Sequence, residues 1–561
     1  MFTRRSLMQF VGVATSGYIG NIHSTELKKG KYPNYPFDPR LERNFIQKLF
    51  IPMFSGLLGV LDVVGPLKIR ATASSFAILP GPDSQGASPF LLYQTEYAGS
   101  AFENPIFRIE RGARFTASLK NDMPEPTIIH WHGLHTPAAM DGHPSSTIGP
   151  GASYHYDFNI VNRGGTYWYH THAHELTAKQ AYNGLASFFL VEDDDQRALT
   201  TAVNLQLGET DLPLVIQDKQ FDATGALHYK PNAHESMMGW LGDVVVVNLT
   251  PNAVQSVARR TYRFRLLNGS NARIYRLAFV LDGSKLNFSV VGTDGGLIER
   301  AESVTEAFIA PGERLDVLFD AGQAEPGKAI FLKSLAFDAM ENEGDMGGKR
   351  NWVGDHDKRE TSSMSSMSSM SSMSSMSSME SSSSRLAMGA EFNILKLSVM
   401  VGDRTTARLP AILSKIKAIA KDGATKRDID LSMRDMSFLI NGLRYQAKQI
   451  AFDVKRATVE IWTIRNPAIG MPHPLHIHGF SFQVVERLNS PPHVSDVGQF
   501  GGGRTVSDLG LKDTVLVWPG ETVRIAIDFS HDFPGNQTYV FHCHNLEHED
   551  AAMMINFRVV T

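Results

Sequence analysis

The chain of 561 residues contains almost no cysteine, because Cys543 is the only one. A single thiol cannot form a disulfide within the chain, so the fold is stabilised without one. Neither sign of charge is in excess either: 54 Lys and Arg residues oppose 58 Asp and Glu residues, for a formal net charge of −4. This balance disfavours nucleic acid and anionic membrane surfaces as partners.

Long hydrophobic runs are also missing. An apolar stretch at residues 49–64 contains Pro52, Asp62 and two glycines, and it is shorter than the roughly 20 apolar residues that a membrane-spanning helix needs. We therefore predict no membrane span and interpret this stretch as core or interdomain packing. We also expect the protein to be a monomer.

The sequence does have the composition of a large β-rich protein. Hydrophobic residues make up 42% of the chain, and 47 glycines and 27 prolines suit many short strands joined by turns. The length predicts three or four domains. The fold class that we predict is all-β.

The lone cysteine lies between two histidines, in His542-Cys543-His544. The preceding residues, 538–541, are β-branched or aromatic and predict a strand. Successive strand side chains point to opposite faces, so His542 and His544 project to one side and Cys543 to the other. A thiolate with imidazoles is typical of an electron-transfer copper site, and imidazoles alone suit a second metal centre. The alternative is a buried free cysteine between surface histidines.

Three further histidine clusters share this spacing, each beside an apolar or aromatic run. They are His130-Trp131-His132, His170-Thr171-His172 and His473-Pro474-Leu475-His476-Ile477-His478. One such pair is weak evidence for metal binding, but four are not expected by chance. A mononuclear copper site would take Cys543, two histidines and a weak axial methionine, namely His473, His548 and Met553. Eight histidines are then left, enough for a cluster of three coppers that reduces dioxygen.

These four segments resemble the four copper motifs of the multicopper oxidases, in order and in spacing. Residues 510–515 and 519–521 also resemble the bacterial laccases and cuprous oxidases, so the resemblance extends from about residue 65 to the C-terminus, apart from one insertion. It implies three cupredoxin-like Greek-key β-sandwich domains and an oxidoreductase with dioxygen as acceptor. It also implies four copper ions as cofactors: one type 1, one type 2 and a type 3 pair.

The resemblance assigns every ligand by position. The type 1 copper is expected on His473, Cys543 and His548, with Met553 axial. The type 2 copper is expected on His130 and His476. The type 3 pair is expected on the remaining six histidines, which are His132, His170, His172, His478, His542 and His544.

Two acidic residues match the family's proton-relay positions. Reduction of dioxygen to two waters consumes protons, so carboxylates are expected near the cluster. Asp141 follows His130 by eleven residues, and Glu549 directly follows His548. We predict that both carboxylates supply protons during catalysis.

The motifs and composition divide the chain into five segments. We predict an export signal with an N-terminal extension at 1–39, a first domain at 40–195, a second at 196–345, a Ser/Met-rich insertion at 346–390 and a third domain at 391–561. The first and third domains carry the histidine motifs, so the cluster must form where they meet. The second domain has no clustered histidines and is interpreted as a spacer.

The first residues indicate export. Arg4-Arg5 followed by a short, weakly apolar stretch resembles a twin-arginine signal, although no clear Ala-x-Ala cleavage site follows. We expect a periplasmic or otherwise exported protein. The alternative is an exposed basic N-terminus.

The insertion repeats Ser-Ser-Met six times, with the methionines at every third position from Met364 to Met379. It has two interpretations: a low-complexity linker, or a mobile array of thioethers that collects Cu(I). It resembles the methionine-rich insertions of bacterial cuprous oxidases, but lacks their interspersed histidines. Met471 matches a substrate-copper ligand of that subfamily, whereas Ile469 occupies the companion acidic position.

The predicted function is that of a multicopper oxidase. The favoured substrate is Cu(I), in copper resistance and detoxification. The alternative is a laccase-like oxidase of small phenols, for which the methionine repeat is only a linker. A third hypothesis, a copper-binding cupredoxin without catalysis, is disfavoured because no copper ligand of the motifs is missing.

Overall fold

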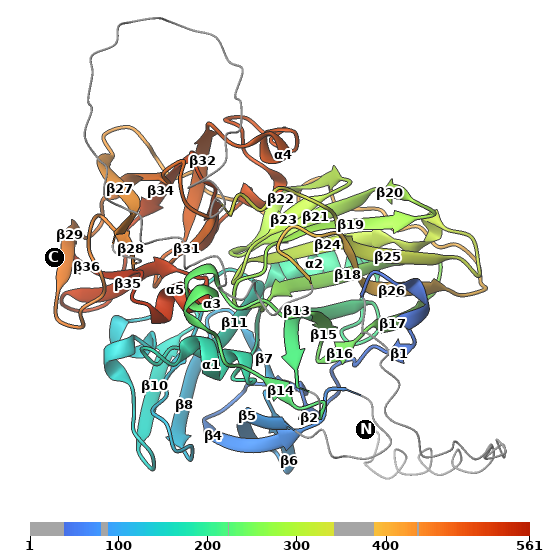
Figure 1. The fold of residues 1–561 in the computed structure, drawn as a ribbon, viewed down its shortest axis with the longest axis horizontal. Coiled ribbons are helices and arrows are strands. Elements are labelled where there is room, and N and C mark those ends of the chain that lie inside the picture. The colour runs from blue at the N-terminus through green and yellow to red at the C-terminus, as the bar shows by residue number, and fades with distance from the viewer. Residues whose placement is uncertain (1–38, 80–87, 223, 342–385, 435–436) are drawn as a thin grey trace, which may run out of the picture. The chain divides into compact units, whose positions relative to one another are not determined.

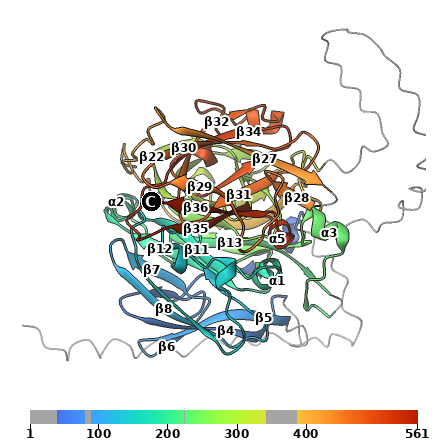
Figure 2. The ribbon, with the colours of Figure 1, turned by 90° about the vertical axis from the view of Figure 1, so that its left-hand side faces the viewer.

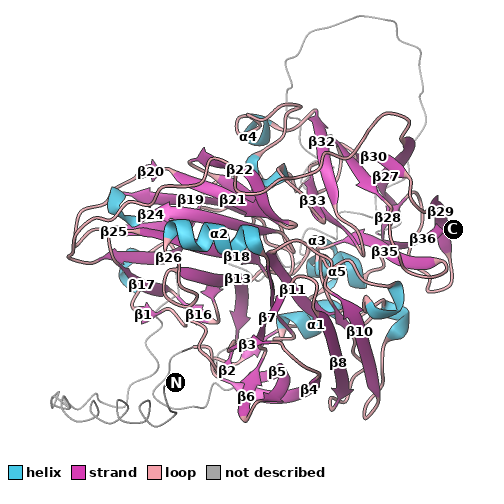
Figure 3. Cartoon of the chain, turned by 180° about the vertical axis from the view of Figure 1, so that it is seen from behind, coloured by secondary structure: helices cyan, strands magenta, loops and turns pink. Residues whose placement is uncertain are grey.

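The computed structural model describes residues 39–79, 88–222, 224–341, 386–434 and 437–561. The predicted export signal, apart from residue 39, and the six repeat methionines of the predicted insertion lie outside these ranges. Strands dominate the described residues and the helices are short (Figure 3). In these ranges no helix has both the length and the apolar character to cross a membrane. The all-β prediction is confirmed.

The first sandwich consists of two sheets, drawn in blue and cyan in Figure 1. One sheet has the order β10 (Ser153–Asn159), β8 (Arg114–Asn121), β4 (Leu67–Phe76), β5 (Ser88–Tyr97), β6 (Ser100–Glu103) and β2 (Gly56–Leu57). The other has the order β3 (Val60–Asp62), β7 (Ile106–Glu110), β12 (Ala186–Glu192), β11 (Gly165–Thr171) and β9 (Ile129–His130). An aromatic core lies between them and includes Phe107, Phe115, Trp131 and Tyr169.

The second sandwich contains the two largest sheets. One has the order β1 (Gln47–Lys48), β17 (Ala253–Val257), β26 (Phe392–Val399), β25 (Ala329–Ser334), β19 (Tyr275–Leu281) and β20 (Ser284–Leu286), with β23 (Ala307–Ile309) beside β19. The other has the order β16 (Thr250–Pro251), β15 (Val244–Val247), β13 (Asp211–Phe221), β18 (Thr261–Asn268), β24 (Arg314–Asp320), β21 (Phe288–Thr293) and β22 (Gly296–Val304), with β14 (Leu227–His228) beside β13.

Two strands of the second sandwich lie outside its predicted range of 196–345. Strand β1 pairs in parallel with β17, and β26 pairs with both β17 and β25. The strand after the insertion therefore completes the second sandwich, whereas we had predicted that the third domain begins at residue 391. Alternation of apolar residues marks β26 as a strand but does not show which sheet it joins.

The third sandwich begins with β27. One sheet has the order β28 (Ser437–Ile440), β27 (Thr425–Arg434), β30 (Val459–Arg465), β34 (Thr522–Asp528) and β32 (Phe482–Leu488). The other has the order β29 (Ile450–Lys455), β36 (Met554–Val560), β35 (Gln537–Cys543), β31 (His473–Ile477) and β33 (Thr514–Val517). The predicted strand at 538–541 thus lies within β35.

The α-helices of the described residues are short and lie between strands. They are α1 (Thr177–Tyr182), α2 (Asp194–Val203), α3 (Ala233–Met238), α4 (Pro492–Ser495) and α5 (Leu546–Asp550). Helix α5, which follows the cysteine motif, contacts both α1 and α3. The end of β35 therefore lies where segments of all three sandwiches meet.

Buried hydrogen bonds join the first and third sandwiches. The Tyr539 hydroxyl donates to the carbonyl of Thr136 at 2.6 Å, and His143 Nε2 lies 2.9 Å from Asn556 Oδ1. Figure 2 shows β11 of the first sandwich next to β35 of the third, and His172 Nε2, directly after β11, lies 3.4 Å from His542 Nε2 in β35. Since buried polar groups need partners, these bonds fix how the two sandwiches dock.

The Tyr539→Phe substitution tests this docking. It leaves the buried Thr136 carbonyl without a partner, so we expect the free energy of unfolding to fall by about 1–3 kcal/mol. The matched control is Tyr154→Phe, because the Tyr154 hydroxyl also donates to a carbonyl, that of Ala139, but at an exposed position within the first sandwich. Urea unfolding followed by circular dichroism measures both; equal losses would contradict the interpretation.

Candidate metal centres

The four histidine motifs lie on two pairs of neighbouring antiparallel strands. In the first sandwich β9 pairs with β11, and His130 is opposite His170. In the third sandwich β31 pairs with β35, and His476 is opposite His542. The register therefore brings motifs that are far apart in the sequence next to each other within each sheet.

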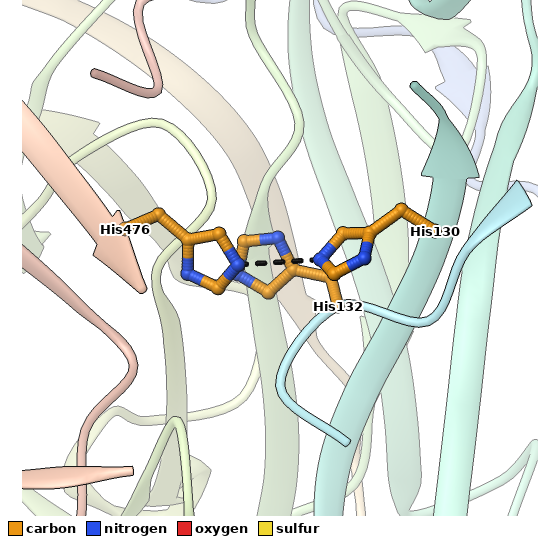
Figure 4. Close-up of side chains that lie close together, drawn as sticks. All are labelled: His130, His132 and His476. Carbon is orange, nitrogen blue, oxygen red and sulfur yellow. Dashed lines mark hydrogen bonds between the residues drawn. The ribbon is translucent and has the colours of Figure 1, made fainter. Parts of the chain in front are cut away.

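Eight buried imidazoles meet where these two strand pairs face each other. Two groups of three are separate, one of His132, His170 and His544 and the other of His172, His478 and His542. A third group joins His130 and His476 with His132. Figure 4 shows His130 and His132 from the first sandwich facing His476 from the third; the Nε2 atoms of His130 and His476 are 3.3 Å apart.

A separate group of ligands surrounds Cys543. Its Sγ atom lies 3.5 Å from Nδ1 of His473 and 3.5 Å from Nδ1 of His548. Met553 is fully buried in the same core cluster, and the backbone N–H of Cys543 donates to its carbonyl at 3.0 Å. The predicted mononuclear set is thus gathered inside the third sandwich.

The alternation along β35 separates the two kinds of site as predicted. Tyr539, Phe541 and Cys543 all belong to the core of the third sandwich. His542 and His544, on either side of Cys543, belong to the two different three-histidine groups. His542 Nδ1 also donates to the carbonyl of Cys543 at 3.0 Å. One tripeptide therefore connects three groups of ligands.

Two elements cover the Cys543 group from outside. The Phe438 ring of β28 lies 5.1 Å from the ring of His473 and 4.3 Å from that of His548. Helix α3, which belongs to the second sandwich, accepts a hydrogen bond of 2.8 Å from His548 Nε2 at the carbonyl of Met237. Both imidazoles are consequently buried.

Burial keeps the histidines in a form that suits a metal, but it has the opposite effect on the cysteine. Loss of solvation lowers the pKa of nine of the ten motif histidines, those of His170 and His548 to about 4. Neutral imidazoles offer free lone pairs, which makes them good ligands. Burial also raises the pKa of the Cys543 thiol, so its thiolate requires a bound cation.

The donor set fits copper. Both ring nitrogens of His544 and Nδ1 of His172 are buried and have no hydrogen-bond partner in the part of the chain that the structure describes. Unpartnered buried nitrogens are costly and are expected where a metal satisfies them. The Cys543 group offers a soft thiolate and two imidazoles, and the other groups offer imidazoles only, which is the chemistry that copper binds.

The two predicted acids contact cluster imidazoles. Asp141 Oδ2 accepts a hydrogen bond of 2.6 Å from His478 Nδ1. Its Oδ1 lies 3.6 Å from His130 Nδ1 and has no hydrogen-bond partner among the described residues. Glu549 Oε2 lies 3.2 Å from His542 Nδ1, and Oε1 lies 3.6 Å from His172 Nε2. Both are buried, and burial raises the pKa of Asp141.

A third acid at the cluster was not predicted. Asp513 Oδ1 lies 3.0 Å from His132 Nε2, and its carboxylate pairs with Arg314 of the second sandwich. Residues 510–515 resemble family sequences, but nothing in that motif reveals a contact with a histidine 381 positions away. The second sandwich, which we had interpreted as a spacer, therefore supplies Arg314 and α3 to the two ligand sites.

Comparison with known proteins gives the family. Multicopper oxidase models match residues 94–196, 165–343 and 418–561. A multicopper oxidase of Staphylococcus aureus is 28% identical over 86% of this chain and 90% of its own length, and a laccase of Bacillus subtilis is 29% identical over 76% and 78%.

The solved structures agree. The McoA multicopper oxidase of Aquifex aeolicus is 35% identical, with a TM-score of 0.76 over 92% of this chain and 99% of that one. Solved structures of this kind confirm the predicted fold of three cupredoxin-like domains. The family implies copper cofactors, and the histidine groups fit them. The chain belongs to the multicopper oxidases and is an oxidoreductase that acts with dioxygen.

Proposed function

We propose that this oxidase couples the one-electron oxidation of Cu(I), in copper detoxification, to the four-electron reduction of dioxygen to water. Bound copper supplies the electron transfer and the dioxygen chemistry. The chain holds the ions, connects them and supplies protons. The observation that carries the proposal is the position of Cys543, which belongs to one ligand group while each neighbouring histidine belongs to another.

The proposed ligand roles follow the groups. His473, Cys543 and His548 hold the type 1 copper, with Met553 axial. Of the eight cluster histidines, His130 and His476 are left after the two separate groups of three, and they hold the type 2 copper. The two groups of three, formed by His132, His170 and His544 and by His172, His478 and His542, hold one type 3 copper each.

Asp141 and Glu549 are proposed to hold the protons that dioxygen reduction consumes. Each carboxylate lies beside cluster imidazoles and has an oxygen without a hydrogen-bond partner. A buried carboxylate with a free oxygen can take a proton and pass it to a nearby oxygen species.

Cu(I) as substrate is supported by thioethers around the electron-entry site. Met471 shares the core cluster of Cys543, and Met237 and Met238 of α3 pack against that cluster. Met433 is opposite Phe438 in the β27–β28 hairpin and is 47% exposed. Thioethers are soft ligands that favour Cu(I).

The second candidate function is phenol oxidation, as in the laccases. The relative from Bacillus subtilis is a laccase. Ile469, at the position that is acidic in the cuprous-oxidase subfamily, is 77% exposed and offers an apolar surface. Under this alternative the methionine repeat is a linker only.

Replacement of the thiolate tests the proposed electron entry. In Cys543→Ser the soft ligand is lost, so we expect no blue colour and no substrate oxidation, while the eight cluster histidines still bind copper. Visible absorption, dioxygen uptake and copper content per chain measure these effects. Blue colour or turnover in the variant would refute the assignment.

Asp141→Asn tests the proposed proton supply. An amide can still accept the bond from His478 but cannot carry a proton, so dioxygen turnover should slow by about 10²- to 10⁴-fold. The visible absorption of the type 1 site should stay the same. Undiminished turnover would remove Asp141 from the mechanism.

Shortening the insertion separates the two substrates. Deletion of residues 361–384 should lower kcat/KM for Cu(I) several-fold and leave phenol oxidation unchanged. A control chain in which the six repeat methionines are serines keeps the length, and it should behave like the deletion if the thioethers matter. Unchanged Cu(I) kinetics in both chains would refute the hypothesis that the methionine repeat collects Cu(I) for the enzyme.

A further inference from the structure

Asp513 lies at the start of β33 and is bound to histidines of both cluster-bearing sandwiches. Its Oδ1 atom accepts a hydrogen bond of 3.0 Å from Nε2 of His132, which belongs to the first sandwich. Its backbone carbonyl accepts one of 2.9 Å from Nδ1 of His476, on β31 beside it. The rings of His132 and His476 stack with their centroids 3.7 Å apart and their planes within 12°.

Arg314 of the second sandwich holds the Asp513 carboxylate. Its two terminal nitrogens donate to both carboxylate oxygens, at 2.8 and 2.5 Å. The other three N–H groups donate to backbone carbonyls, those of Thr166, Gly312 and Asp294. All five donors are therefore used, so the guanidinium has one orientation and so has the carboxylate it binds.

These contacts decide which ring nitrogen is free for a metal. A carboxylate and a carbonyl can only accept, so His132 carries its proton on Nε2 and His476 carries its proton on Nδ1. The opposite nitrogens keep their lone pairs: His132 Nδ1 faces His170 Nε2 at 3.3 Å, and His476 Nε2 faces His130 Nε2 at 3.3 Å. Both free nitrogens point into the cluster.

The backbone beside His132 packs directly against the ion pair of Asp513 and Arg314. Gly133 has a φ of +85°, and a Cβ atom there would lie 2.4 Å from Asp513 Oδ2 and 2.8 Å from a terminal nitrogen of Arg314. The first sandwich thus approaches the ion pair to within contact distance. Three sandwiches contribute to this point: the first through His132, the second through Arg314 and the third through Asp513.

We infer that Asp513, held by Arg314, is the positioning residue that orients His132 and His476 for copper. The inference rests on the proposed ligand roles of these two histidines. Its consequence is that the second sandwich takes part in building the trinuclear site, although it contributes no ligand. A hydrogen-bonded carboxylate fixes the tautomer and ring orientation of a metal-binding histidine and makes it a stronger ligand.

A matched ion pair in the third sandwich serves as the control. Arg487 binds Asp508 through two hydrogen bonds of 2.7 and 2.8 Å, and both residues are buried. Within the described residues the Asp508 carboxylate accepts hydrogen bonds from Arg487 and Thr505, and from no cluster histidine. Asp508→Asn therefore breaks a buried carboxylate–guanidinium pair of the same kind without touching the cluster.

The test compares Asp513→Asn with Asp508→Asn in the full chain. Copper affinity is measured by competition with a chelator, and type 2 copper by electron paramagnetic resonance. In Asp513→Asn we expect the affinity of the cluster for copper to fall by about 10- to 100-fold and the type 2 signal to change. The visible absorption of the type 1 site should stay the same. Asp508→Asn should keep the wild-type affinity and signal.

Equal copper affinities and signals in the two variants would overturn the inference, because the ion pair at Asp513 would then be structural only. If Asp513→Asn does not fold, Arg314→Lys takes its place. Lysine keeps the positive charge but loses the bidentate contact with Asp513. We expect a smaller fall in the affinity of the cluster for copper. An unchanged cluster in Arg314→Lys would also overturn the inference. Failure of the wild type itself to bind copper at the cluster histidines would instead refute the proposed function.

Discussion

Both ligand sites depend on the alternation of side chains along β35. Because neighbouring strand residues leave on opposite faces, Cys543 points into the core of its own sandwich while His542 and His544 point away from it. The two histidines that point away can form metal sites only if another surface supplies the remaining ligands. The pairing of β9 with β11 in the first sandwich presents that surface, with His130 opposite His170. A shift of one residue in the pairing of β35 would point His542 and His544 toward the core and Cys543 toward the interface.

An interface of this composition is costly to bury without compensation. Eight imidazoles and three carboxylates, those of Asp141, Asp513 and Glu549, lie buried between two sandwiches. Buried polar groups must be paired, and a buried charge must be paired with an opposite charge. For Asp513 the second sandwich supplies that charge through Arg314. For Asp141 the structure provides a histidine partner but no cation, and burial raises its pKa accordingly. The three acids thus differ in environment although all touch imidazoles.

The sequence predicts the local features of this protein well and the long-range ones in part. Strand alternation around Cys543 was sufficient to separate its side from that of His542 and His544, since the two-residue period is a local property. The position of Asp141 was found through a motif, and its contact with His478 then followed from the docking of two sandwiches. No local pattern could predict that Arg314 reaches Asp513, because the two are 199 residues apart and arginine is usually a surface residue. The sequence also did not predict that β26 joins the second sandwich, because its pairing with β17 and β25 is a long-range contact as well.

The closed surface around His548 limits how an electron donor can approach. The Nε2–H of this imidazole already donates to the Met237 carbonyl, so a donor cannot form that hydrogen bond while α3 keeps its place. Phe438 covers both imidazoles of the site, and His473 is only 2% exposed. With electron entry at the Cys543 site, as proposed, electrons cross a layer of protein formed by the β27–β28 hairpin and helix α3 of the second sandwich. The side chains of that layer, among them Met237, therefore determine which electron donors can come close to the Cys543 site. The metal ligands themselves do not make that selection.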